Sequence, residues 1–310
     1  MPELGLDAAS HGQPLSAPEI GRLRDLRLGH LRADLELAQP DYPARLRRAM
    51  GDADALGVPL HLALHIAVED GPAQVSALAD LVAELKPPGG GMACLPGSRA
   101  LLGRIAGASG VGAGARRAGW SGAGRSLRRR NRCRLHLHLD VRQMSLFGAG
   151  WTVCSLRSLA ATGVAAITYY ETTGWHGVMK TAGGSPLPEL FHSFAGGVFP
   201  LYHVFADVAD FAGGDVLALS GDQPLAVDGL ALRKDGRIRI LVANMTAGAQ
   251  TAVMRGLPRQ VSTRLLDATN VVAAMQTTAA FRAQPGRIQE TTAGRLALTL
   301  PPYAVARLDG

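Results

Sequence analysis

The first 86 residues alternate between short strand patterns and amphipathic helix patterns, and this alternation constrains the fold more than any other feature. Strand patterns cover residues 4–9, 31–37 and 59–66. Helix patterns run from the Ser16–Glu19 capping box, from Asp41 to Leu56, and over 72–85. Three strand–helix units in so short a segment predict an α/β fold with parallel strands joined by right-handed crossovers.

The strands at 31–37 and 59–66 distinguish between two parallel architectures. Apolar and polar residues alternate in both, and Asp34, Glu36 and His65 lie late in the strands. Strands of an open doubly wound sheet are buried on both faces, so they usually read as continuous apolar runs. A barrel lines its interior with one set of side chains and carries functional residues at the carboxyl ends of its strands. The pattern favours an incomplete (β/α)8 TIM-type barrel over a flavodoxin-like sheet.

Regular patterns return at Asp140 and change character near Gly213-Gly214. A helix is predicted over 144–161, a strand over 164–170 and a helix over 199–211, which complete the barrel part at 140–213. Residues 214–310 read instead as short strands separated by turns, which predicts a small antiparallel β-sandwich. The strands expected there are 216–219, 229–233, 237–243, 260–266, 295–300 and 304–308.

Residues 87–139 fit neither pattern, with twelve glycines, ten arginines and no lysine, aspartate or glutamate. A structureless segment of this length is uncommon inside a compact domain, so 87–139 does not fit as an ordinary loop of the barrel. It is either a flexible, disordered insertion or a stretch read out of frame in place of the middle barrel strands, and the composition favours the second. These arginines exceed the net charge of +7 by themselves, so the rest of the chain is net negative and no nucleic-acid partner is predicted.

Several functional classes are not expected. Cys133-x-x-His136-x-His138 lacks the paired spacing of zinc sites, so no metal and no cofactor are predicted. The cysteines Cys94, Cys133 and Cys154 form no disulfide framework. No apolar run approaches the roughly 18 residues of a membrane span, and no leader is visible at the start. A cytoplasmic protein without a membrane partner is therefore expected.

Several stretches of the chain carry a family resemblance. They are 9–12, 31–35, 141–152, 167–179, 196–204 and 226–233, and the most specific part is Tyr-Tyr-Glu-Thr-Thr-Gly-Trp at 169–175. These stretches resemble the D-apionate lactonase family. The resemblance implies a barrel with β-domains and the hydrolysis of D-apionolactone to D-apionate in bacterial apiose catabolism. The chain departs from the family in two respects. It lacks the β-rich domain before the barrel, and residues 87–139 do not match the middle strands.

Glu171 is the strongest candidate for a catalytic residue. It is predicted to end the strand 164–170, before a Thr-Thr-Gly turn, which would place its carboxylate at the barrel mouth. There it could act as a nucleophile or as a general base. The alternative is a structural carboxylate that caps a helix or pairs with an arginine.

Seven further residues are candidates for substrate binding. Polar side chains near the ends of the first three strands suit sugar hydroxyls or proton transfer, and aromatic and histidine side chains after strand 164–170 suit stacking on a sugar ring. Each could equally be structural, and Asp34 could form an interior ion pair with Arg32. The candidates are His11, Asp34, Glu36, His65, Tyr170, Trp175 and His176.

Three functions remain open on this evidence. The leading one is a lactonase whose partner is a small sugar lactone. The second is a retaining glycoside hydrolase, which needs another carboxylate near Glu171. The third is a non-catalytic remnant, inactive through loss of the middle barrel strands.

Overall fold

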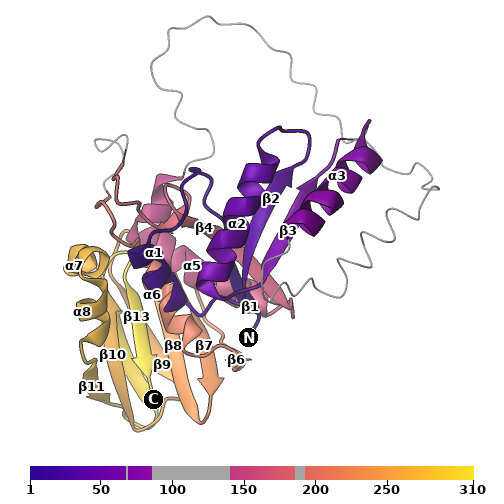
Figure 1. The fold of residues 1–310 in the computed structure, drawn as a ribbon. Helices are drawn as coiled ribbons and strands as arrows, with labels where there is room; N and C mark the ends of the chain where they lie inside the picture. Colours follow the sequence, from indigo (N-terminus) through magenta and orange to yellow (C-terminus); the bar gives the residue numbers. More distant parts are fainter. Residues whose placement is uncertain (68, 86–139, 186–192) are drawn as a thin grey trace, which may run out of the picture. The chain divides into compact units, whose positions relative to one another are not determined.

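The computed structural model describes residues 1–67, 69–85, 140–185 and 193–310, which form two compact units (Figure 1). Among the described residues, the first unit contains 1–34, 44–63, 140–185 and 193–310, and the second contains 35–43, 64–67 and 69–85. The predictions for 87–139, including the cysteine–histidine pattern and the reading-frame hypothesis, lie outside the described residues.

A five-stranded sheet in the order β3-β2-β1-β4-β5 confirms the predicted α/β class. The pairings of β1 with β2, β1 with β4 and β4 with β5 are all parallel. The ends of β2 and β3 belong to the second unit, where the Leu37 amide donates to the His65 carbonyl over 3.0 Å. The strands are β1 (Glu3–Asp7), β2 (His30–Glu36), β3 (Leu60–His65), β4 (Ala166–Thr173) and β5 (Gly177–Met179).

The alternation in the sequence corresponds to two distinct faces of this sheet. Leu6, Leu31 and Ile167 are buried on the apolar face. The residues between them, such as Asp7 and Arg32, are polar and only partly buried. A barrel uses its strands in this way, with apolar residues toward the helices and the other set toward the interior.

The helices begin where the sequence predicts, within a few residues. At the start of α1, the backbone amide and Oγ of Ser16 both donate to Oε2 of Glu19, over 2.8 and 2.7 Å. The capping box is thus confirmed. No helix in the described part of the chain is long and apolar enough to span a bilayer. The helices of this part are α1 (Ala17–Arg24), α2 (Tyr42–Leu56), α3 (Gly71–Glu84), η1 (Val141–Met144), α5 (Leu146–Ala160) and α6 (Pro200–Ala209).

The C-terminal part confirms the predicted β-sandwich. A six-stranded sheet, β11-β10-β13-β8-β7-β6, faces the pair β12-β9 across an apolar core that includes Val242, Leu300 and Leu308. Its strands are β6 (Asp215–Leu217), β7 (Val227–Lys234), β8 (Arg237–Asn244), β9 (Gln250–Arg255), β10 (Gln260–Leu266), β11 (Arg287–Glu290), β12 (Arg295–Leu300) and β13 (Val305–Asp309). Two short helices, α7 (Val271–Gln276) and α8 (Thr278–Ala283), follow β10. The sequence analysis did not predict β9, β11, α7 or α8.

Helices α5 and α6 join the parallel sheet to the sandwich within the first unit. Helix α5 packs on β7 and β8. A Cβ at Gly150 of α5 would crowd the side chains of Met245 and Ala243, so this position needs glycine for the close approach. Helix α6 contacts the parallel sheet, because Phe205 packs against Tyr169 and Tyr170 of β4.

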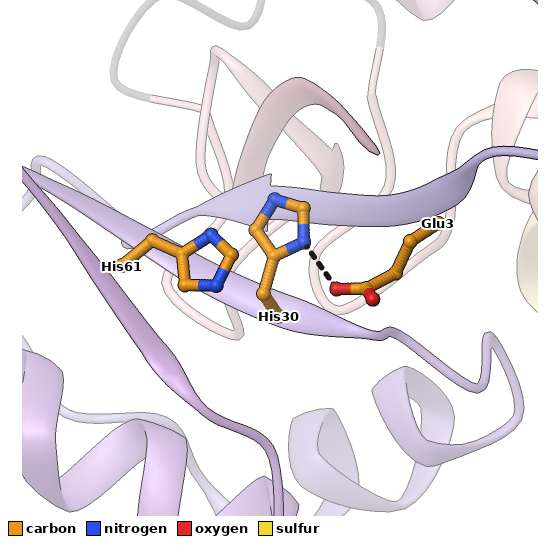
Figure 2. A group of neighbouring side chains, drawn as sticks. All are labelled: Glu3, His30 and His61. Atoms are coloured by element: carbon orange, nitrogen blue, oxygen red, sulfur yellow. Dashed lines mark hydrogen bonds and ion pairs between the residues drawn. The ribbon is translucent and has the colours of Figure 1, made fainter. Parts of the chain in front are cut away.

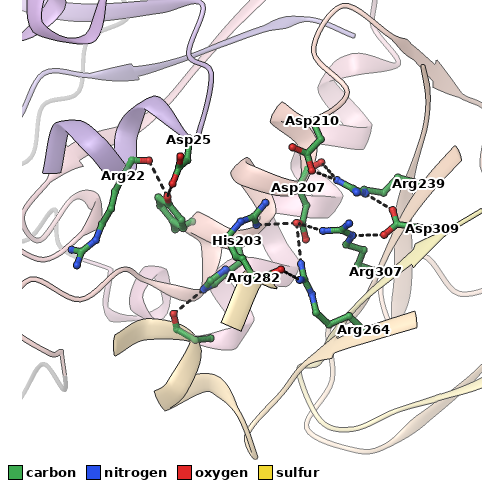
Figure 3. A network of polar contacts seen from close by, with 12 residues as sticks. Arg22, Asp25, His203, Asp207, Asp210, Arg239, Arg264, Arg282, Arg307 and Asp309 are labelled. Carbon is green, nitrogen blue, oxygen red and sulfur yellow. Dashed lines mark hydrogen bonds and ion pairs between the residues drawn. The ribbon is translucent and has the colours of Figure 1, made fainter. Parts of the chain in front are cut away.

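Asp207 of α6 anchors the sandwich through arginines (Figure 3). Its Oδ1 accepts hydrogen bonds from Arg264, Arg282 and Arg307 over 2.9–3.2 Å. Arg239 donates to its backbone carbonyl over 2.7 Å. Burial alone would raise the pKa of Asp207, but the four arginines outweigh burial and hold the pKa below its ordinary value. The Asp207 cluster, formed by these five residues, therefore ties one barrel helix to three strands and a helix of the sandwich.

Candidate active site

A β-bulge at Tyr170 determines where the side chains of β4 point. The pairing register with β1 shifts at this point, so Tyr169 is opposite Leu6 and Glu171 is opposite Asp7. Tyr170 takes a φ of +25°, a strained backbone conformation that absorbs the extra residue.

The bulge sends two consecutive tyrosines to the helix face of the sheet. The Tyr169 hydroxyl contacts Ser155 Oγ at 2.6 Å, and the Tyr170 hydroxyl contacts Thr152 Oγ1 at 2.9 Å, both on α5. In an unbroken strand Tyr170 and Glu171 would each face the other way. The bulge therefore returns Glu171 to the polar face, beside β1.

Glu171 is held by the loop that follows β1. Its Oε2 accepts hydrogen bonds from the Ser10 amide over 2.9 Å and from Ser10 Oγ over 3.0 Å. Its own amide donates to the His176 carbonyl over 2.8 Å. The strand does not end before Glu171, as the sequence suggested, but continues to Thr173. The carboxylate still lies near the carboxyl end of β4, where barrel enzymes place reactive groups.

Asp7, the last residue of β1, is a second carboxylate in this site, and the sequence analysis missed it. Burial raises its pKa to about 6, Arg32 opposes the shift, and the charges of Asp34 and Glu171 add to it. The Oδ1 atom is buried and accepts no hydrogen bond from the described residues, although Arg32 Nε lies 3.6 Å away. Two neighbouring carboxylates thus occupy environments that differ in burial and in hydrogen bonding.

Arg32 and Asp34 of β2 border this pair. Arg32 donates to Asp34 Oδ1 from Nε over 3.1 Å and from Nη2 over 2.7 Å. Both side chains are partly exposed, so the ion pair adds little stability but keeps a guanidinium near Asp7.

His11 lies on the other side of the Ser10 loop. Its Nδ1 accepts from the Gln13 amide over 3.2 Å, so its Nε2–H can donate to Thr173 Oγ1 over 2.6 Å. These two contacts orient the His11 imidazole at the carboxyl end of β4. The structure brings together Asp7, Ser10, His11, Arg32, Asp34, Glu171 and Thr173.

Comparisons with known proteins agree with this architecture. The family model described as "D-apionate lactonase, TIM barrel domain" matches residues 121–213, and "D-apionate lactonase, C-terminal immunoglobulin-like domain" matches 224–308. Together they cover more than half of the chain. The chain belongs to the D-apionate lactonase family. Membership indicates a carbohydrate-processing hydrolase. The match to the barrel model begins at residue 121, inside the glycine- and arginine-rich segment.

Solved structures support the fold of this D-apionate lactonase family member. A GH30 endoxylanase from Clostridium papyrosolvens C71 is similar, with a TM-score of 0.59 and 12% identity over 100% of this chain and 96% of that chain. The xylanase Xyn30A of glycoside hydrolase family 30 subfamily 8 from Clostridium acetobutylicum gives a TM-score of 0.57 and 11% identity over 99% and 95%. At such identity the likeness concerns the fold alone. A search of curated proteins gives no significant match.

Tyr170 has the contacts of a packing residue in this family member. Its hydroxyl is bonded to Thr152, its ring packs against Tyr169 and Phe205, and burial raises its pKa to about 12. The predicted role of Tyr170 in a sugar-stacking wall gains no support from these contacts, because its hydroxyl and ring are already engaged with the helix layer.

Trp175 and His176 follow β4, and a buried lysine, missed in the sequence, lies beside the tryptophan. The Lys180 ammonium is 5.3 Å from the centre of the Trp175 ring, and the lysine is only 2% exposed. Burial lowers the pKa of Lys180 to about 8. The side chain directly follows β5, so a positive charge lies at the carboxyl end of another barrel strand.

Glu36 and His65 are the last residues of β2 and β3 and are exposed. Both belong to the second unit, so their convergence with Glu171 stays a prediction. Among the described residues, one group could offer three ligand atoms to a metal ion. It consists of Glu3, His30 and His61, at the amino ends of β1, β2 and β3.

Proposed function

We propose that this chain hydrolyses the ester bond of a sugar lactone of the D-apionolactone type. The observation that carries the proposal is the carboxylate pair of Asp7 and Glu171, which are register partners on adjacent parallel strands. Pairs of acids in unlike environments divide the roles of proton donor and proton acceptor. Family membership supports the choice of a sugar lactone as the substrate.

Glu171 is proposed as the general base. Both hydrogen bonds from Ser10 end on Oε2, and Oε1 has no recorded partner in the described part of the chain. Oε1 would accept a proton from a water molecule while the water oxygen forms a bond to the lactone carbonyl carbon. Arg32 would stabilise the negative charge that develops on the carbonyl oxygen.

Asp7 is proposed as the general acid. With a pKa of about 6, Asp7 is still protonated in a fraction of the molecules near neutral pH. As the tetrahedral intermediate breaks its bond to the ring oxygen, Asp7 would transfer its proton to that oxygen, which leaves as a hydroxyl group. The product is the open hydroxy acid. Glu171 then releases to solvent the proton that it took from the water molecule, and Asp7 takes up a proton from solvent, so both carboxyl groups return to their starting states. The reaction consumes one water molecule and needs no cofactor.

Of the remaining candidates, His11, Asp34, Glu36 and His65 are proposed to bind the hydroxyl groups of the sugar, and Trp175 and His176 are proposed to stack on its ring. His11 and Asp34 border the carboxylate pair, and Trp175 and His176 follow β4. Glu36 and His65 are proposed on their strand-end positions alone. A small neutral lactone suits such a set of hydrogen-bonding side chains.

Glu171→Gln tests the proposal because it retains the size of the side chain and removes the base. The variant is expected to lower kcat by roughly 10²-fold or more, with little change in the thermal midpoint. Glu290→Gln, the same change on an exposed edge of the sandwich, is the matched control and should retain full activity. If Glu171→Gln hydrolyses D-apionolactone at the parent rate, the assignment of Glu171 is wrong.

A glycoside hydrolase is the second candidate, because such enzymes also use two carboxylates. Aryl glycosides and aldonolactones offered to the same purified chain would separate the two activities. Turnover of glycosides with no turnover of lactones would favour this second candidate. A folded chain that acts on neither class would favour a non-catalytic protein that has lost part of its barrel.

A further inference from the structure

A second polar cluster lies at the end of the sheet opposite to Glu171. Glu3, His30 and His61 come from the first or second positions of the three adjacent strands β1, β2 and β3 (Figure 2). One ligand atom from each lies within 4.8 Å of the other two. His30 Nδ1 is 3.0 Å from Glu3 Oε1, and the rings of His30 and His61 are stacked 4.3 Å apart.

The chain makes room for this cluster at two glycines. A Cβ on Gly5 would collide with the His30 imidazole, and a Cβ on Gly29 would collide with the Glu3 side chain. His30 is only 1% exposed, and its Nε2 contacts Thr168 Oγ1 of β4 over 2.8 Å. The position of the imidazole is therefore fixed on three sides by β1 and β4.

We propose that Glu3, His30 and His61 bind a divalent transition-metal ion of the zinc type. Two imidazoles and one carboxylate form a ligand set that zinc accepts, with a fourth position left for water. Thr168 supplies the outer contact that ligating histidines usually make through their second nitrogen. Glu3 is about half exposed, which gives an ion access from solvent to the otherwise buried His30.

Binding requires a rotation of the His61 side chain, while Glu3 and His30 can stay nearly in place. Ligand atoms around a tetrahedral zinc ion lie about 3.3 Å apart, given bonds of about 2.0–2.1 Å. Glu3 Oε1 and His30 Nδ1 are already close to this separation. His61 must turn its ring out of the parallel stack so that a nitrogen faces the other two ligands, and it is only partly buried. Thr168 would then accept a hydrogen from His30 Nε2, while any proton on Nδ1 is released to solvent.

The ion would link the first three strands of the parallel sheet. This role is independent of the proposed lactone hydrolysis, because the ligands occupy the amino ends of the strands and the carboxylate pair occupies the carboxyl ends. Residues at the amino-terminal face of a barrel usually contribute to stability and not to catalysis. The ion is therefore expected to raise the free energy of unfolding.

The test is a titration of the untagged, metal-free full chain with Zn²⁺ in competition with a chelator, followed by Co²⁺ spectroscopy. One ion is expected to bind and to raise the thermal midpoint. His61→Phe retains a ring for stacking but removes a ligand, and it should weaken Zn²⁺ binding at least about tenfold. Glu3→Gln, at an accessible position, should do the same. His65→Phe makes the same change on the same strand and should leave the affinity unaltered.

Three outcomes would overturn the proposal. The first is the absence of binding in the parent chain. The second is equal affinity in the parent chain, Glu3→Gln and His61→Phe. The third is a thiolate charge-transfer band in the Co²⁺ spectrum, which would assign the ion to a cysteine such as Cys133. A parent chain that binds Zn²⁺ but does not hydrolyse lactones would count against the proposed function alone.

Discussion

Replacing Asp7 with asparagine is expected to stabilise the fold near pH 8 and to have little effect near pH 4. The ordinary pKa of the carboxyl is 3.8, and burial raises it to about 6 in the folded chain. Below pH 3.8 the group is protonated in both states, so it does not affect unfolding. Between 3.8 and 6 the unfolded chain ionises first, which favours unfolding. Above pH 6 the carboxyl is ionised in both states, so the folded chain bears the full free-energy cost of burying the Asp7 charge.

The size of this penalty follows from the two pKa values. At 1.36 kcal/mol per pKa unit, the difference corresponds to about 3 kcal/mol. About a third of the Asp7 side chain is exposed, so solvent screening reduces the expected gain to about 1–2 kcal/mol. At pH 4 the gain shrinks to about 0.3 kcal/mol. Asparagine fits the same volume, so no packing loss offsets these values.

Thermal unfolding of the parent chain and of Asp7→Asn at pH 4, 6 and 8 measures the effect. A gain of 1–2 kcal/mol should raise the midpoint by about 2–6 °C at pH 8. Asp34→Asn is the matched control, because its carboxylate is hydrogen-bonded to Arg32 and more exposed. That variant should be slightly destabilised. If Asp7→Asn loses stability at pH 8, or gains equally at all three values, the reasoning about burial is wrong.

Two further predictions concern the pH dependence of activity and the anchor of the sandwich. If Asp7 is the general acid, kcat/KM should fall about tenfold per pH unit above pH 6, and Asp7→Asn should lose this dependence. A flat profile for the parent chain from pH 5 to 8, after correction for spontaneous lactone hydrolysis, would exclude this role. Asp207→Asn leaves three partly buried arginines without the buried carboxylate that they share, so denaturant unfolding should show a loss of about 3–5 kcal/mol. Asp210→Asn should cost less than Asp207→Asn, because Asp210 is more exposed and the buried Arg239 retains its bonds to Asp309 and to the Asp207 carbonyl.

The elements with strong periodicity were predictable from the sequence. The segments 31–37 and 59–66 became β2 and β3, and the capping box at Ser16 opened α1 as expected. Edges and irregular strands were harder. The strand β9 alternates in exposure, but its sequence Gln-Thr-Ala-Val-Met-Arg does not alternate between polar and apolar residues. The strand β11 has only four residues, too few to show a period.

The candidate site was only half predictable. Glu171 was chosen as a candidate because it follows an apolar run, and its catalytic role stays a prediction. No sequence pattern indicated that Tyr170 forms a bulge. Without the bulge, strict alternation would place Glu171 on the helix face. Asp7 was missed for a different reason: burial is the main cause of its raised pKa, and the carboxylate beside it, Glu171, is more than 160 positions away in the chain. Such long-range proximity is a property of sheet topology, which local patterns do not contain.

The Asp207 cluster also bears on how such a chain can evolve. One acidic residue on α6 is matched by four basic residues scattered from position 239 to 307, each on a different element of the sandwich. If recombination exchanged the sandwich for an unrelated one, the new sandwich would have to supply all four arginines. Otherwise the buried carboxylate of Asp207 would lose its partners. The barrel helix and the sandwich are therefore expected to be inherited as one piece, even in descendants whose barrels have lost strands.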